Sequence, residues 1–257
     1  MVYGLIRYQG KCFPNKGDEI MSDLEKFKKW AGDCSRIVFF GGAGVSTESG
    51  IPDFRSVDGL YNQKYKYPPE TILSHSFFVR NPAEFFEFYR DKMIFRDAKP
   101  NITHIKLAKM ESEGRLKAVV TQNIDGLHQM AGSKKVLELH GSVHRNYCMK
   151  CGRSYGIEKV TGCSGIPLCE CGGIIRPDVV LYEEGLDQDV LNEAVRYISE
   201  ADMLIVGGTS LSVYPAAGLV RYYRGDKLVL INKSPTPYDK YADLLLQRGL
   251  GEVFASI

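Results

Sequence analysis

Five of the seven cysteines fall within one short segment, and four of these form two closely spaced pairs. Cys148 and Cys151 make a C-x-x-C pair, Cys169 and Cys171 make a tighter C-x-C pair, and a glycine follows each pair. Two such turns supply four thiolates, the tetrahedral ligand set of a structural Zn²⁺ site. Cys163 lies between the pairs and competes for one ligand position. We expect the two pairs to bind one structural Zn²⁺ and not to form disulfides. This expectation places the protein in a reducing compartment.

A second stretch with chemical potential is rich in glycine. It spans Gly41–Arg55, GGAGVSTESGIPDFR, and directly follows the apolar run Ile37–Phe40. Its G-x-G-x-x-T spacing lacks the third glycine of the usual dinucleotide fingerprint. The backbone N–H groups of such a turn can bind a pyrophosphate, and we expect a helix to begin at Val45. The proline, aspartate, phenylalanine and arginine that end the stretch indicate chemistry beyond phosphate binding.

Polar residues also follow other short apolar runs. Two amides and a carboxylate at Gln122–Asp125 would be costly at a strand end without a polar ligand or a hydrogen-bond network. His140 offers a base that titrates near neutrality. Thr209 and Ser210 in a glycine turn, and Asn232 after a further run, suit ribose or phosphate groups.

The elements that must position these groups alternate between strands and helices. The apolar runs are Ile37–Phe40, Ala118–Thr121, Val136–Leu139, Met203–Val206 and Leu228–Ile231. Their Val and Ile content is typical of parallel strands buried on both faces. The pattern predicts an α/β fold, a Rossmann-like doubly wound parallel sheet with a smaller zinc-binding and helical lobe. We assign residues 22–55, 99–143 and 179–257 to the Rossmann-like domain, and the insertions 56–98 and 144–178 to the small lobe.

The first domain has a clear start signal. Ser22 and Glu25 make a capping-box pattern that predicts a helix, with Gly32 past its end. The residues just before Met21 can be encoded by purine-rich codons that resemble a ribosome-binding site. We therefore interpret residues 1–21 as a disordered or mis-annotated extension and Met21 as the native start.

Composition narrows the classes of partner. The 257 residues carry a net charge of +2, and 44% of them are hydrophobic. Because positive and negative charges nearly balance, we expect no direct nucleic-acid partner. No apolar run is long enough to cross a bilayer, so we expect no membrane partner and a cytoplasmic location.

Six motifs occur together in one order: GAGVSTESGIPDFR, TQNIDGLH, LELHG, the paired cysteines, GGTSLSVYPAAG, and IN at 231–232. From about residue 22 to residue 257 they resemble the sirtuin (Sir2-like) family of NAD-dependent protein-lysine deacetylases, bacterial type. The resemblance implies that NAD and an acyl-lysine meet in a cleft between the two lobes. It also implies a reaction that yields nicotinamide, O-acetyl-ADP-ribose and deacetylated lysine.

The resemblance assigns roles residue by residue. His140 would be the general base, with Asn123 and Asp125 as further catalytic residues near the nicotinamide ribose and carboxamide. The implied NAD-binding residues are Ala43, Thr47, Phe54, Arg55, Gln122, Asn123, Ile124, Asp125, His140, Thr209, Ser210, Asn232 and Gly251. The implied partners are proteins or peptides that contain acetylated lysine.

Two features bear on the substrate. Pro177–Tyr182 resembles the family segment that pairs with the substrate peptide as an added strand. Tyr182-Glu183-Glu184 stands where the family more often has aromatic-Gly-Glu. Residues 56–98 lack the Tyr-x-x-Arg pair of family members that prefer acidic acyl groups. We therefore expect uncharged acyl groups, acetyl first.

Three other functions come into question. The same cleft could support mono-ADP-ribosylation of a protein or plain NAD hydrolysis. A zinc-stabilised nucleotide-sensing module fits poorly, because binding alone does not require His140 and Asp125.

Overall fold

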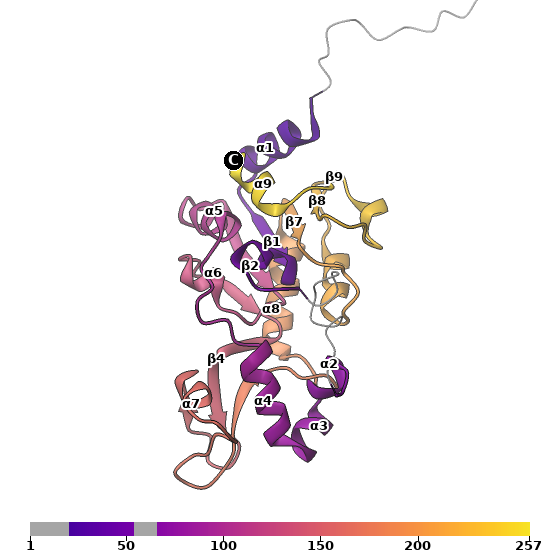
Figure 1. Cartoon of the computed structure of the whole chain (residues 1–257). Helices are drawn as coiled ribbons and strands as arrows, with labels where there is room; N and C mark the ends of the chain where they lie inside the picture. Colours follow the sequence, from indigo (N-terminus) through magenta and orange to yellow (C-terminus); the bar gives the residue numbers. More distant parts are fainter. Residues whose placement is uncertain (1–20, 54–65) are drawn as a thin grey trace, which may run out of the picture.

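The computed structural model describes residues 21–53 and 66–257 (Figure 1). The expected N-terminal extension therefore falls, apart from Met21, outside the described residues. Phe54 and Arg55, two expected NAD ligands, also lie outside them, as does the first part of the expected insertion 56–98.

A six-stranded parallel sheet forms the larger part of the molecule, as the apolar runs predict. Its strand order is β3-β2-β1-β7-β8-β9. The order reverses between β1 and β7, and in doubly wound sheets such a switch point marks the ligand-binding crevice at the carboxyl ends of the strands. The sequence did not predict β9, a run of three leucines. The strands are β1 Ile37–Gly41, β2 Leu116–Thr121, β3 Val136–Glu138, β7 Met203–Gly207, β8 Leu228–Ile231 and β9 Leu244–Leu246.

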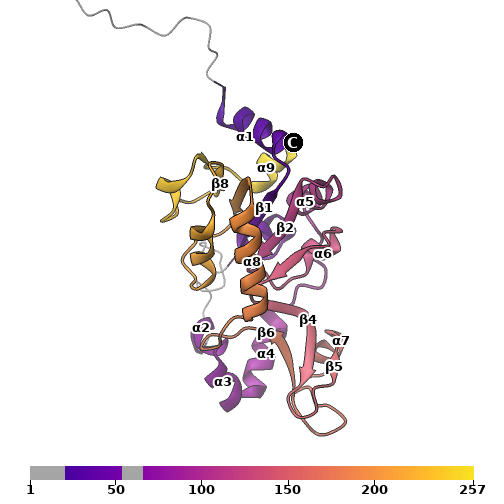
Figure 2. The same cartoon turned by 180° about the vertical axis from the view of Figure 1, so that it is seen from behind.

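Helices cover both faces of this sheet. Side chains alternate along a strand, so β1 directs Val38 and Phe40 to one face and Ile37 and Phe39 to the other. The first face packs against α8 (Gln188–Glu200) and the 3₁₀ helix η4 (Ala216–Tyr222). The second packs against α1 (Asp23–Asp33), α5 (Ile102–Ser112) and α9 (Leu250–Ala255). Figures 1 and 2 show α5 and α8 on opposite sides of the sheet.

The expected capping box opens α1. Ser22 Oγ accepts a hydrogen bond from the Glu25 N–H at 3.3 Å, and the Glu25 carboxylate accepts one from the Ser22 N–H at 2.9 Å. The expected end before Gly32 is wrong, because the helix continues to Asp33 and is capped at Cys34. A glycine inside a helix costs little more than its conformational entropy, so it need not end the helix.

A smaller antiparallel sheet and four helices form the lower part of the molecule (Figure 1). The sheet order is β5-β4-β6. One hydrophobic cluster joins Phe78 and Phe86 of the helices to Val143, Val160 and Val179 of the segment that carries the cysteines. The elements are α2 Pro69–Ile72, α3 His75–Arg80, α4 Pro82–Lys92, α7 Glu158–Thr161, β4 Gly141–Cys148, β5 Ser154–Tyr155 and β6 Ile175–Val179.

The remaining short elements lie in connecting loops. They are the 3₁₀ helices η1 Ala43–Val45, η2 Thr47–Ser49 and η5 Asp239–Tyr241, and helix α6 Leu127–Met130. Among the described residues, no helix has the length and apolar character needed to cross a membrane.

Candidate active site

A cavity of about 840 Å³ lies at the carboxyl ends of the parallel strands. This volume is within the range of small-molecule and cofactor sites. The loops after β1, β2, β3, β7 and β8 all contribute to its wall, as expected for the crevice of a doubly wound sheet. The wall contains the expected site residues Ala43, Thr47, Gln122, Asn123, Ile124, Asp125, His140, Thr209, Ser210 and Asn232.

Gly251 is placed differently from these residues. It does not line the cavity, whereas its neighbour Leu250 does. The Gly251 N–H donates a hydrogen bond to Glu48 Oε1 at 3.1 Å. This bond ties the start of α9 to the glycine-rich loop, a contact that the sequence did not predict.

The glycine-rich loop forms two 3₁₀ turns, so the expected helix from Val45 onward is wrong. Its glycines allow a close approach between neighbouring loops. The Gly44 N–H donates to the Gly208 carbonyl at 2.8 Å, and a Cβ on Gly44 would lie 2.8 Å from the Gly208 Cα. Gly208 itself has a φ of 60°, which favours glycine. These glycines bring the loops after β1 and β7 together at the point where the strand order reverses.

A hydrogen-bonded cluster joins the glycine-rich loop to the loop after β2. Ser46 Oγ donates to Asp125 Oδ2 at 2.6 Å and accepts from Asn123 Nδ2 at 3.1 Å. The Leu127 N–H donates to the other carboxylate oxygen of Asp125 at 2.9 Å. Both catalytic candidates of this loop are therefore held by one hydroxyl, that of Ser46. Ser46 is not among the residues predicted from the sequence, and the pairing of β1 with β2 brings its loop next to Asp125.

Amide and hydroxyl groups line the side of the cavity that follows β7 and β8. Gln122 Nε2 donates to Thr209 Oγ1 at 3.0 Å, which links the loops after β2 and β7. Asn232 Nδ2 donates to the Ser234 carbonyl at 2.8 Å. These groups can exchange hydrogen bonds with ribose hydroxyls and phosphate oxygens, so the residues present fit a dinucleotide.

His140 is positioned as a base. Its Nδ1 lies 3.0 Å from the Gln122 carbonyl oxygen. A carbonyl can only accept, so Nδ1 carries the proton and Nε2 is the unprotonated nitrogen of the neutral ring. Burial lowers the pKa of His140 below its ordinary value, and the hydrogen bond to Gln122 opposes this shift. The ring is therefore neutral near pH 7 and can accept a proton.

The other four histidines lie outside the cavity wall. His104 and His128 are buried against each other, with ring centroids 4.6 Å apart. Burial lowers the pKa of His104 to about 4 and that of His128 to about 3. His75 and His144 are exposed. Of the five histidines, His140 is the one that lines the cavity.

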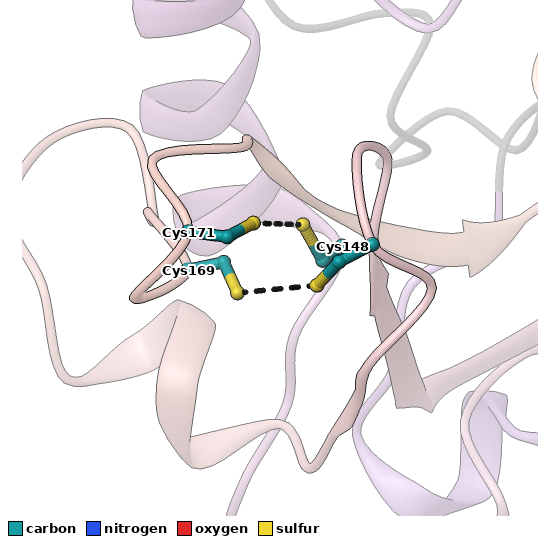
Figure 3. A group of neighbouring side chains, drawn as sticks. Cys148, Cys169 and Cys171 are labelled. Atoms are coloured by element: carbon teal, nitrogen blue, oxygen red, sulfur yellow. Dashed lines mark hydrogen bonds between the residues drawn. The ribbon is translucent and has the colours of Figure 1, made fainter.

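The four paired cysteines converge on one point (Figure 3), and none of them lines the cavity. Their Sγ atoms lie within 4.8 Å of one another. Cys148 and Cys171 Sγ are 3.5 Å apart, and Cys151 and Cys169 Sγ are 3.6 Å apart. Zn–S bonds of about 2.3 Å in a tetrahedron place sulfurs about 3.8 Å apart. The four cysteines are therefore positioned to bind a structural Zn²⁺.

Cys163 does not belong to this group. Its Sγ lies 3.5 Å from the Val160 carbonyl and 3.6 Å from the Gly165 carbonyl. The C-x-C turn instead brings Cys169 into the cluster, where the Tyr155 hydroxyl donates to its Sγ at 3.0 Å. This hydrogen bond lowers the pKa of the Cys169 thiol to about 6 and favours the thiolate that a metal requires.

Comparisons with known proteins identify the family of this chain. The profile of the Sir2 family matches residues 42–215. A Clostridium acetobutylicum protein named NAD-dependent protein deacetylase is 61% identical over 242 residues, which are 93% of this chain and 99% of that one. A Clostridium perfringens protein of the same name is 58% identical over 238 residues, covering 91% and 98%.

Solved structures give the same result. A Sir2 structure with a deacetylated peptide and 3′-O-acetyl ADP-ribose has a TM-score of 0.82 and 43% identity, covering 91% of this chain and 96% of that one. A Sir2 structure with a peptide and NAD⁺ has a TM-score of 0.78 and 42% identity, covering 90% and 95%. Because the family profile spans most of the chain and these relatives match nearly all of it, the chain belongs to the Sir2 family.

Proposed function

We propose that this protein is an NAD-dependent protein-lysine deacetylase. The observation that carries the proposal is the pairing of a neutral, oriented imidazole with the Ser46–Asn123–Asp125 cluster in one cavity. A protein that only senses a nucleotide would not need a base held in this way. The Sir2 relatives bound to peptides and acetylated ADP-ribose support the same conclusion.

NAD, when bound, supplies an electrophilic ribose carbon, C1′, and nicotinamide as the leaving group. Asp125 and the Ile124 backbone would hold the nicotinamide carboxamide, and Asn123 would lie near the nicotinamide ribose. His140 would accept a ribose hydroxyl proton at Nε2, a step typically worth about 10²–10⁴-fold in rate. The acetyl group would pass to ADP-ribose as the amide C–N bond of acetyl-lysine breaks and one water is consumed, so that the lysine amine is released.

The remaining NAD contacts divide between the two sides of the sheet switch point. Ala43, Thr47 and Gln122 bind the phosphates and the nicotinamide ribose, together with Phe54 and Arg55. Thr209, Ser210 and Asn232 bind the adenosine half, with Gly251 close to the adenine.

The described parts of the two expected insertions, 66–98 and 144–178, form the small lobe, and Leu73, Met93 and Phe95 of this lobe line the cavity. The hydrophobic cluster that joins Phe78 and Phe86 to Val143 and Val160 supports this division, because it draws on both insertions. Residues 22–55, 99–143 and 179–257 form the NAD-binding domain.

The substrate peptide would lie along Pro177–Tyr182 and the two residues that follow. The residues from Val179 to Glu184 line the cavity, and the Val180 N–H donates to the His140 carbonyl at 3.0 Å. This bond places the base next to the segment that would carry the peptide. The absence of a Tyr-x-x-Arg pair in residues 56–98 favours acetyl over succinyl groups. The clustered cysteines suit a cytoplasmic enzyme.

An NAD-dependent deacetylation assay on an acetyl-lysine peptide tests the proposal, with wild type compared with His140→Ala. We expect wild type to be active and the variant to lose about 10²–10⁴-fold in kcat. Thermal unfolding of the variant should remain cooperative, since His140 lies at the cavity rather than in the hydrophobic core. Equal rates for the two proteins would contradict the proposal. Faster turnover of a succinyl-lysine peptide than of an acetyl-lysine peptide would contradict the expected acyl preference.

A further inference from the structure

Residues 179–184 have two sides with different partners. On one side Tyr182 pairs with the junction of α2 and α3. The Tyr182 N–H donates to the Leu73 carbonyl, and the His75 N–H donates to the Tyr182 carbonyl, both at 3.0 Å. On the other side the segment lines the cavity. The position of residues 179–184 relative to the small lobe therefore sets the geometry of their backbone edge, along which a substrate peptide would lie.

Glu183 adopts an unusual backbone conformation in this segment. Its φ is 75°, in the left-handed region that favours glycine. Among the described residues, Leu211 is the one other non-glycine residue with positive φ. Such a conformation persists when surrounding contacts offset its cost, and it is common at functional sites.

The Glu183 side chain supplies these contacts itself. One carboxylate oxygen accepts from the Ser76 N–H at 2.9 Å, and the other accepts from Ser76 Oγ at 3.0 Å. Ser76 lies in the first turn of α3, where backbone N–H groups have no partner within the helix. The negative charge also suits a helix start. The carboxylate is thus bonded to the small lobe rather than directed at a substrate.

The next residue strengthens the same attachment. The Glu184 carboxylate forms two hydrogen bonds with the Arg176 guanidinium, at 2.7 and 2.8 Å. It also accepts from the Leu181 N–H at 2.9 Å and contacts His75 Nδ1 at 2.7 Å. Because Arg176 is buried, the ion pair between Arg176 and Glu184 holds the end of the segment 179–184 in place. Glu183 is exposed and provides the outer bond.

We propose that Glu183 is a positioning residue for the substrate peptide. Through Ser76 it fixes the outer end of the edge, Tyr182–Glu184, to α3 of the small lobe. The inner end is fixed separately by the Val180–His140 backbone bond. Loss of the Glu183 bonds therefore loosens contacts with residues that flank the acetyl-lysine and leaves the base in place. This inference rests on the proposed deacetylase function.

Kinetics with two substrates test the proposal. One substrate is a peptide with several residues on each side of an acetyl-lysine, and the other is a single acetyl-lysine blocked at both ends. For Glu183→Ala we expect the peptide KM to rise about fivefold, the size of one ordinary hydrogen bond. The KM for blocked acetyl-lysine should change less than twofold, because this substrate has no flanking backbone. The peptide Kd, measured by fluorescence anisotropy, should rise with the peptide KM.

Three further variants separate the hydrogen bonds from backbone strain. Glu183→Gln keeps one acceptor for the Ser76 N–H and one donor for Ser76 Oγ, so its peptide KM should stay near wild type. Glu183→Gly relieves the positive φ and should have a higher Tm than Glu183→Ala, yet show the same rise in KM. Ser76→Ala removes one of the two bonds, so its effect should be smaller and not additive with Glu183→Ala. Glu200→Ala, an exposed change on α8, is the matched control.

Clear results would overturn the inference. An unchanged peptide KM and Kd in Glu183→Ala would do so, as would equal rises for the peptide and for blocked acetyl-lysine. A wild-type KM in Glu183→Gly would show that strain, not the Ser76 bonds, is responsible. Wild type that turns over neither substrate would instead contradict the deacetylase function. The anisotropy measurement still decides the role of Glu183 in that case, because it needs no turnover.

Discussion

The cavity and the metal centre are both clusters of reactive side chains at the end of a sheet, but they rest on very different hydrophobic cores. The cysteines pack with a single small cluster of Cys148, Cys169 and Ile175, with Tyr155 at its edge. The cavity residues follow strands whose two faces are each covered by helices. At the metal centre, therefore, metal binding by the four cysteines stabilises the local fold. At the cavity, the hydrophobic core of the sheet positions the polar side chains.

This difference predicts opposite responses to mutation. Mutation of a metal ligand should first impair folding, and activity should be lost as a consequence. Residues of the cavity should affect activity with little loss of stability, because the sheet beneath them persists. The predictions below test this contrast in order of decreasing effect.

Loss of the metal should have the largest effect. A structural Zn²⁺ contributes about 10 kcal/mol or more of binding free energy that is coupled to folding. Cys151→Ala should therefore abolish stoichiometric zinc and unfold the segment around β4–β6. Zinc content, circular dichroism and activity measure these effects. Cys163→Ala is the matched control and should retain zinc, because Cys163 lies outside the group of four. A zinc-free Cys151→Ala protein with wild-type Tm and activity would contradict the contrast.

Ser46 tests the cavity side. In Ser46→Ala, Asp125 and Asn123 lose the hydroxyl that orients both. A hydrogen bond to a charged group is worth about 1.5–3 kcal/mol, so kcat/KM should fall about tenfold or more. The Tm should change little, since the cavity admits water to the freed groups. Ser199→Ala on the surface of α8 is the control. A large loss of Tm with unchanged kcat/KM would place Ser46 with the structural residues.

The pH dependence of kcat/KM should give a smaller effect. As the proposed general base, His140 would act only when neutral, and burial lowers its pKa from the ordinary value of 6.5. A lowered pKa keeps the base neutral to lower pH, so the acid limb should have its midpoint below pH 6.5. A rate profile from pH 5 to 8 measures this midpoint. A midpoint at or above 6.5 would mean that burial does not govern the titration of His140.

The sequence predicts much of the fold and the site because parallel strands end at one edge. The apolar runs mark the strands, and their polar ends identify Gln122–Asp125, His140 and Asn232. The strand order was not readable, so the meeting of Ser46 with Asp125 was missed. Local signals also failed where tertiary contacts decide the outcome. Two 3₁₀ turns replace the helix expected from Val45, since the loop packs against its neighbour after β7.

The metal ligands show how much the spacing of a motif can predict. The C-x-x-C and C-x-C pairs identify the donor set, but spacing alone left Cys163 as a competitor. The structure decides this point, because the turn at Cys169–Cys171 brings both sulfurs to the cluster. Glu183 is a further case. Its departure from the family pattern is visible in the sequence, but its bonds to Ser76 depend on the packing of α3 against residues 179–184.

Product analysis tests the central claim most directly. Wild-type protein, NAD and an acetyl-lysine peptide with a labelled acetyl group are incubated, and the products are separated and quantified. We predict one nicotinamide and one labelled acetyl-ADP-ribose for each lysine released. Free ADP-ribose without deacetylation, or ADP-ribose attached to protein, would contradict the account and indicate NAD hydrolysis or ADP-ribosylation instead.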